Sequence, residues 1–236
     1  NCGVLCPVKN VLYRSSIVCD VSSVPAASTG DYDYDAIMPR INPDTLVTEI
    51  AHVYADEFDE ETGIEFRNLK AIINCPNATI ANLQATKINE IMGRDVAISL
   101  HKVGISDKEY DRLKDEFQYG GRYNVVCQVG TLTEGFDDVT VALCINYPTR
   151  SRVKAEQTSG RVIRIDENNS DKFAFVIDTM FRSSPDGGDE DILYAASKAH
   201  QVLFADIADG NIVLDRHGIQ RRLANQNSTG PRKHHN

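Results

Sequence analysis

The sequence lacks the phosphate-binding loop that many nucleotide-binding proteins share. None of its 15 glycines is followed by lysine, so the pattern G-x-x-x-x-G-K-[ST] is absent. There is also no apolar run near the roughly 18 residues that cross a bilayer, and the N-terminus lacks the charged and then apolar layout of a signal peptide. We therefore expect a soluble, cytoplasmic protein that does not contact a membrane.

Basic residues are scarce relative to acidic ones. The 25 lysines and arginines face 34 aspartates and glutamates, which gives a net charge of −9. Because a general affinity for nucleic-acid phosphates needs the opposite balance, the composition excludes a protein that binds nucleic acid over its whole surface. Residues 216–236, however, carry five basic side chains and no acid. This tail either contacts nucleic acid or is merely solvated.

Cysteines are too few and too scattered to indicate a metal centre. Three of the six, Cys75, Cys127 and Cys144, lie inside apolar runs, where a thiol packs as a small hydrophobic group. Cys2 and Cys6 could begin a zinc site, but no second Cys or His pair at zinc spacing follows. We expect no metal site within this chain.

The chain has enough apolar material for a core. Of its 236 residues, 42% are apolar and 25% are charged, which is typical of a globular protein. Five short apolar or β-branched runs are nearly continuous, as in strands that are buried on both faces. These runs are residues 69–75, 96–100, 123–129, 140–146 and 173–177. We therefore expect an α/β protein with a mostly parallel sheet covered by helices.

Helical spacing fills the intervals between these runs. Asn77 is placed to cap a helix that ends at Gly93, and Ser106 with Glu109 forms a capping box before a second helix. A third helix is expected over about residues 152–164. Strands that alternate with helices imply right-handed crossovers, and ligands of such folds lie beyond the carboxyl ends of the strands.

The two ends of the chain are less regular. Asn42-Pro43-Asp44 is a good helix start, and residues 185–188, Pro-Asp-Gly-Gly, break the chain before a helix expected over 192–207. These signals divide the chain into three parts. Residues 1–41 precede the core domain, 42–180 form it, and 181–236 form a helical extension and the basic tail.

Two segments contain the side chains that indicate a function. Residues 130–138 read G-T-L-T-E-G-F-D-D directly after an expected strand, and residues 157–164 read Q-T-S-G-R-V-I-R. Arg161 and Arg164 are three positions apart, on one side of a helix, and Gln157 is one turn earlier. Two guanidinium groups on one face suit a polyphosphate. The alternative is that both arginines are solvated and pair with nearby acids, namely Glu156, Asp166 or Glu167.

The order of these segments resembles a known family. A strand, G-T-L-T-E-G-F-D, a second strand and Q-x-x-G-R-x-x-R together resemble the fifth and sixth motifs of superfamily 2 helicases. The segments are similar to those in the second RecA-like domain of the branch that contains RadD-like proteins, UvrB and restriction-enzyme motor subunits. The resemblance covers roughly residues 30–180 and is specific at 129–164. It implies a three-layer RecA-like fold, with helices on both faces of the sheet.

The resemblance also implies roles at a nucleotide. Arg161 and Arg164 would be arginine fingers that reach the γ-phosphate of ATP, and Gln157 would contact the phosphates or position the attacking water. Three further residues are expected at the nucleotide: Gly135, which permits a tight loop, Gly160, and Asp137, which accepts hydrogen bonds near the ribose or links the nucleotide to the nucleic-acid groove.

A second set of residues is expected to contact nucleic acid, either DNA or, as the second possibility, RNA. The resemblance places Asn77 and His101 there, because free amides at a helix N-terminus suit phosphates. The sequence departs from the family pattern at Val129-Gly130, where a Thr-Asp pair is common. A phosphate contact from a threonine would therefore have to come from Thr131 or Thr133.

ATP and Mg²⁺ would be held mainly by a first RecA-like domain of the same protein, which this chain does not contain. Residues 1–41 would then be the connector from that domain. Residues 56–59, Asp-Glu-Phe-Asp, superficially resemble the Mg²⁺-binding acidic motif of such motors, but their place after an amphipathic helix favours a solvated acidic face. By its spacing, His52 is interpreted as a packed helix residue.

The sequence thus predicts the C-terminal half of an ATP-dependent helicase or translocase that is inactive as an ATPase alone. One alternative is a helicase-derived module that binds nucleic acid or protein without hydrolysis. Another is an unrelated wound α/β enzyme that binds a small nucleotide without a glycine-rich loop.

Overall fold

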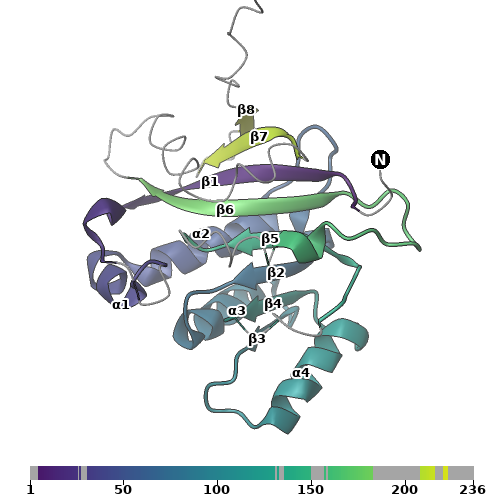
Figure 1. Cartoon of the computed structure of the whole chain (residues 1–236), viewed down its shortest axis with the longest axis horizontal. Coiled ribbons are helices and arrows are strands. Elements are labelled where there is room, and N and C mark those ends of the chain that lie inside the picture. The colour runs from purple at the N-terminus through teal and green to yellow at the C-terminus, as the bar shows by residue number, and fades with distance from the viewer. Residues whose placement is uncertain are drawn as a thin grey trace, which may run out of the picture.

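A single sheet runs through the computed structural model, with helices on both of its faces (Figure 1). The structure describes residues 5–25, 27, 31–130, 132, 136–149, 157, 159–182, 208–215 and 220–222. For Ser22 and for the two C-terminal stretches, only the backbone is described.

Eight strands form the sheet, in the order β3-β4-β2-β5-β6-β1-β7-β8 (Figure 1). Neighbouring strands pair in parallel, except for β7 and β8, which are antiparallel. The strands are β1 (Val8–Val18), β2 (Lys70–Asn74), β3 (Ala97–Leu100), β4 (Val125–Gln128), β5 (Val141–Asn146), β6 (Ala174–Arg182), β7 (Ala208–Asp215) and β8 (Gln220–Arg222). The five strands expected from apolar runs, β2 to β6, are confirmed.

Strand β1 is the main addition to the predicted fold. It lies inside the sheet, between β6 and β7. Its residues Lys9 and Asn10 are each only 1% exposed, and a strand that buries polar groups lacks the apolar signature of the others. Residues 8–18, which were expected to precede the core domain, therefore pair within the same sheet as β2 to β6.

The sheet also continues past residue 180, where the core domain was expected to end. Strand β6 continues to Arg182, and β7 and β8 extend the sheet beyond β1. The helix expected over residues 192–207 lies outside the described residues, as does the tail beyond residue 222. The described part of the C-terminal segment is thus strand rather than helix.

The two faces of the sheet are covered by different elements. Helices α2 (Pro43–Asp56) and α3 (Ala78–Met92) pack on one face, and α4 (Asp107–Tyr119) packs on the other (Figure 1). Leu132, Phe136 and Val162 are buried with α4 on that second face. The short elements are α1 (Tyr34–Ile37), η1 (Val21–Ser23), η2 (Met38–Arg40) and η3 (Phe66–Asn68).

The helix starts expected from capping residues are confirmed. The side chain of Asn77 accepts a hydrogen bond of 2.9 Å from the amide of Ile80, and Ser106 Oγ accepts one of 3.2 Å from the amide of Glu109. Asn42 caps α2 in the same way. These side chains satisfy amides that have no partner within the helix, which fixes where each helix begins.

Two predictions about single polar residues are wrong. Asp59 does not lie on a solvated acidic face: its side chain is 2% exposed and forms a 2.8 Å ion pair with Lys9. His52 is not packed in the core: its side chain is 52% exposed, and its Nδ1 lies 2.6 Å from an oxygen of Asp56. The local pattern could not reveal the contact of Asp59, because its partner is fifty residues away. His52 and Asp56, in contrast, are four positions apart on α2, a spacing at which helix side chains meet.

The core cysteines follow the prediction. Cys75, Cys127 and Cys144 are free and buried within the two apolar clusters of the sheet. Cys6 is also buried, beside Val162. No helix in the described part of the chain combines the length and the apolar character that crossing a bilayer requires.

Candidate functional site

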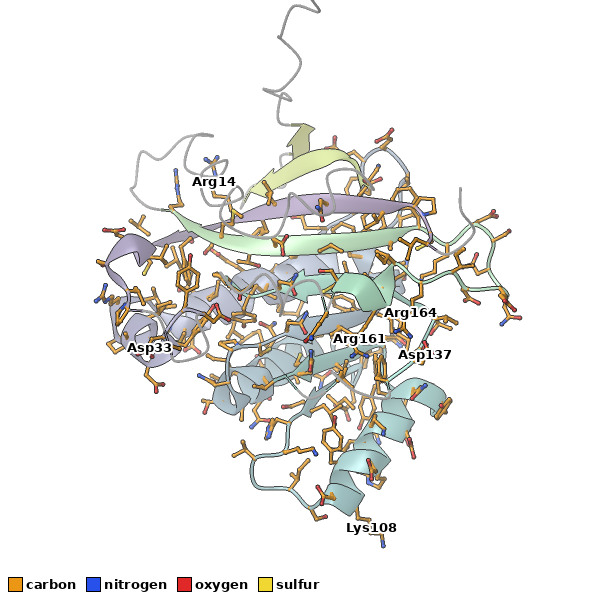
Figure 2. All side chains as sticks on the ribbon, viewed as in Figure 1. Arg14, Asp33, Lys108, Asp137, Arg161 and Arg164 are labelled. Carbon is orange, nitrogen blue, oxygen red and sulfur yellow. The ribbon has the colours of Figure 1, made fainter. Side chains whose placement is uncertain are left out.

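The structure brings together the two segments that the sequence singles out. Arg161 lies within a helical stretch at residues 159–162, and its Nη1 donates a 2.7 Å hydrogen bond to the carbonyl oxygen of Phe136. The neighbouring Arg164 donates from Nη1 to the carboxylate of Asp137. Figure 2 shows both arginines and Asp137 close together beside α4. We call these four residues the arginine cluster.

The arginines do not contact the acids that were expected as their partners if both were merely solvated. Among the described residues, Arg164 pairs with Asp137 rather than with Asp166 or Glu167. The Arg161 guanidinium also lies 6.0 Å from the centroid of the Phe136 ring, within the range of a cation–π contact. Glu156, the third acid considered, lies outside the described residues.

The arginine cluster places two positive charges next to each other in a partly buried position. Burial lowers the pKa of Arg161 below its ordinary value, and the like charge of Arg164 lowers it further. An arginine remains protonated near neutral pH despite such a shift. Two adjacent guanidinium groups that repel each other gain stability from an added anion, which is the property a phosphate site needs.

The loop that carries Phe136 and Asp137 is fixed from several sides. The Phe136 ring stacks on Phe117 of α4, with the centroids 5.9 Å apart, and Gln118 donates a 2.8 Å hydrogen bond to the Asp137 carbonyl. Asp138 forms a 2.6 Å ion pair with Lys70, and both side chains are largely buried. These contacts hold the partners of both arginines in place.

The loop does not stay at the carboxyl edge of the sheet, where we expected it. It starts there, at Gly130, whose φ of +61° is in the left-handed region that favours glycine. Asp138, however, lies beside Lys70, the first residue of β2. Because β4 and β5 run in parallel, the chain between them has to cross from one edge to the other. The arginine cluster therefore lies toward the amino ends of the strands.

Several predicted site residues can be placed only in part. Gly135 of the nucleotide set and Thr131 and Thr133 of the nucleic-acid set lie outside the described residues. Gln157 is exposed. A Cβ atom at Gly160 would meet nothing within 4 Å, so close packing does not explain the glycine at this position.

The two described residues of the predicted nucleic-acid set lie at the carboxyl edge. Asn77 follows β2 and His101 follows β3, and His101 Nε2 lies 3.2 Å from Oδ1 of Asn82 on α3. Among the described residues, the buried Nδ1 of His101 has no partner. Val103, in the next turn of chain, is 69% exposed. The side chain of Asn77 already caps α3, so what this position presents to a ligand is the start of the helix.

A buried row of polar side chains under the loop is not apparent from the sequence. It crosses four adjacent strands in register, with Asn74 donating to Asn146 at 2.7 Å and Asn146 donating to Asp178 at 2.8 Å. Gln128 donates to Asn74 and accepts a 3.1 Å hydrogen bond from the amide of Leu132. The only sequence signal is that three of the apolar runs have an amide side chain at their last or last but one position. The row ties the start of the loop to the sheet.

The sheet and its two covered faces define the class of this protein: it is a RecA-like α/β domain. No protein-family model matches the chain, and a search of curated proteins finds no match. Solved structures do match.

A fragment of a putative HsdR subunit of a type I restriction enzyme from Vibrio vulnificus has a TM-score of 0.61 at 17% identity. The match covers 93% of this chain and 38% of that one. The C-terminal domain of the DEAD-box protein Dbp5 has a TM-score of 0.53 at 18% identity, over 89% of this chain and 91% of that domain.

Saccharomyces cerevisiae Dbp5 bound to RNA and ADP BeF3 has a TM-score of 0.51 at 17% identity, over 87% of this chain and 41% of that one. The chain thus spans less than half of the two longer proteins and nearly all of the Dbp5 C-terminal domain. At these identities, the similarity concerns the fold alone.

Proposed function

We propose that the chain is the second RecA-like domain of an ATP-dependent superfamily 2 helicase or translocase. The observation that carries the proposal is the arginine cluster, in which Arg161 and Arg164 lie side by side against residues 136 and 137. The fold of the domain supports it. Within the superfamily, the sequence at 129–164 favours the branch with RadD-like proteins, UvrB and restriction-enzyme motor subunits.

In this proposal, the arginines act on ATP that is held mainly by a first motor domain. Mg²⁺ bound there with ATP would neutralise part of the phosphate charge. Arg161 and Arg164 would donate hydrogen bonds to the γ-phosphate, whose charge has to be stabilised during transfer. Gln157 would contact the phosphates or orient the attacking water. Gly160, which has open space where a side chain would be, would let a phosphate approach the helix.

The present partners of the arginines allow this change of ligand. Arg164 and Asp137 are 43% and 68% exposed, and an exposed ion pair is worth little because water and salt screen it. Arg161 gives up one hydrogen bond to the carbonyl of Phe136 and gains the stronger attraction of a phosphate. Closure of the two domains would then release Asp137 to the ribose or to the nucleic-acid groove.

Nucleic acid would bind at the carboxyl edge, where Asn77 and His101 lie and where Thr131 and Thr133 begin the loop. The N-terminus of α3 offers backbone amides to phosphates. The net charge of −9 confines such binding to a narrow groove. We propose DNA as the partner, and RNA is the alternative, since Dbp5 itself was solved with RNA.

ATP turnover tests the proposal. The isolated chain should show none, because the residues that hold ATP and Mg²⁺ lie on another domain. Turnover by the isolated chain that Arg161→Ala abolishes would contradict the proposal, since it would mean that a complete site lies within these residues.

A second candidate is a helicase-derived interaction module that no longer takes part in hydrolysis. One observation favours it: both arginines already have partners, Asp137 and the carbonyl of Phe136, without any phosphate. The two candidates separate in the protein that joins this chain to its first motor domain. An unchanged nucleic-acid-stimulated ATPase after replacement of both arginines by alanine would favour the module.

A further inference from the structure

Lys172 is a buried lysine that connects the two segments of the candidate site. It lies two residues before β6 and is only 5% exposed. Its Nζ lies 2.6 Å from the carbonyl oxygen of Val139 and 2.8 Å from that of Arg164. Val139 follows Asp137 by two positions, and Arg164 is one of the two arginines of the arginine cluster.

The chemistry of an ammonium group suits this position. Lysine has three donors on one atom, so it can hold two carbonyl oxygens from separate segments at once. Burial lowers the pKa of Lys172 below its ordinary value of 10.5, although Cys6, Asp166 and Asp138 raise it in part. A lysine placed where burial disfavours its charge is held there by its hydrogen bonds.

The backbone around Arg164 is also held by the residues just before β1. The amide of Cys6 donates a 2.8 Å hydrogen bond to the carbonyl of Ile163, and Leu5 forms an isolated bridge with Arg164. These contacts attach Arg164 to the start of β1, but they do not reach the loop. Among the described residues, Lys172 is the side chain that donates to both segments.

We propose that Lys172 is a positioning residue that sets the distance between the Asp137 loop and the Arg164 backbone, and so aims both arginines at the phosphate. This inference rests on the proposed function. Lys172 touches no substrate; it acts through Val139 and Arg164. Because it also lines a cavity of about 390 Å³, water can enter when the ammonium group is removed and can solvate the two carbonyls. The domain should therefore fold without Lys172, with the arginines less well aimed.

The first test uses the chain itself and does not depend on ATP hydrolysis. The side-chain ¹⁵N signals of Arg161 and Arg164, assigned with Arg→Lys variants, are compared in wild type, Lys172→Met and Lys172→Arg. We expect Lys172→Met to move both signals toward those of a free arginine and Lys172→Arg, which keeps the donors, to restore them. The control is Lys87→Met, which removes a lysine that pairs with Glu90 on α3. Unmoved signals in Lys172→Met would overturn the proposal.

The second test measures ATP turnover in the protein that joins this chain to its first motor domain. Lys172→Met should lower kcat about 10- to 100-fold, the range expected when catalytic groups are misplaced by about 1 Å, with KM for ATP nearly unchanged. Val176→Ala, a buried change in the neighbouring strand β6, serves as the control for a loss of stability and should retain its kcat. Equal losses of kcat in the two variants would mean a structural role only and would overturn the proposal.

The two tests separate the possible failures. A wild-type protein without nucleic-acid-stimulated turnover would contradict the proposed function, and the ¹⁵N signals would still decide the role of Lys172. Should Lys172→Met not fold, Lys172→Ala, which removes the donors and leaves more room for water to solvate the two carbonyls, is measured in the same two ways, with the same outcomes supporting or overturning the proposal.

Discussion

Two ion pairs of this domain differ sharply in burial. The side chains of Lys9 and Asp59 are each 2% exposed, whereas those of Arg164 and Asp137 are 43% and 68% exposed. Both pairs join segments that are far apart in the sequence. The buried pair can serve only the fold, because neither charge could find another partner without a large cost. The exposed pair can dissociate at little cost, as a site that changes ligands requires.

The surroundings of the buried pair support this contrast. Asp59 also accepts hydrogen bonds of 2.8 and 2.6 Å from the amide and hydroxyl of Thr62, and Lys9 also pairs with Glu61 at 2.9 Å. Burial raises the pKa of Asp59, but the bonds from Lys9 and Thr62 outweigh it and leave the pKa below 3.8. A fully satisfied pair of this kind fixes β1 in the sheet.

The largest expected effect concerns the exposed pair. In the protein that joins this chain to its first motor domain, Arg164→Ala should lower the ATPase rate by about 10³-fold or more, the effect of losing an arginine finger. The stability of the domain should change by less than about 1 kcal/mol. Steady-state kinetics and thermal melting measure the two quantities.

A matched control for this variant is Arg112→Ala. Arg112 forms a 2.8 Å pair with Glu109 on α4, and both side chains are exposed. Its loss should leave the rate unchanged. Equal rate losses in the two variants would contradict the proposed role of Arg164, because an exposed arginine with no role at ATP would then have the same effect.

The second effect concerns the buried pair. Lys9→Met leaves the carboxylate of Asp59 buried without its main partner, which should lower the free energy of unfolding by about 3–5 kcal/mol. Denaturant unfolding measures this, and Lys87→Met serves as the surface control. A loss no greater than that of the control would show that the buried pair does not stabilise β1.

A smaller effect should appear in acid. Because the pKa of folded Asp59 lies below its ordinary value of 3.8, its stabilising contribution is present above pH 3.8 and is lost as the pH falls through the folded pKa. Unfolding curves at several pH values should therefore show a steeper loss for wild type than for Asp59→Asn below this point. Parallel losses in the two proteins would place the acid sensitivity elsewhere.

The smallest effect is expected for Asp137→Asn. The exposed pair should contribute less than about 1 kcal/mol to stability, and high salt should reduce that further. Thermal melting at low and high salt measures it. A loss as large as that of Lys9→Met would mean that Arg164 is held by Asp137 too tightly to exchange partners.

The sequence predicts the part of the fold that depends on local patterns. Continuous apolar runs mark β2 to β6, and capping residues mark the starts of α2, α3 and α4. Strand β1 is different, because Lys9 reads as a surface residue until Asp59, fifty positions later, is brought beside it. The same long-range contact buries Asp59, the last residue of the predicted acidic face.

The candidate site divides in the same way. Arg161 and Arg164 can be found from their spacing and from the motif that surrounds them. The pairing with Asp137, the row of polar side chains from Gln128 to Asp178, and the contacts of Lys172 cannot, because each depends on register or on backbone carbonyl groups. In the sequence alone, the polar residues that make such contacts look the same as polar residues on the surface.

In the proposed function, Arg161 and Arg164 complete an ATP site whose other half lies on a first motor domain. Nucleic-acid-stimulated ATP hydrolysis by the protein with both domains, before and after Arg161→Ala and Arg164→Ala are combined, tests this role. We expect a loss of about 10³-fold or more with the domain still folded. Unchanged hydrolysis in the folded double variant would contradict the proposed role of the two arginines.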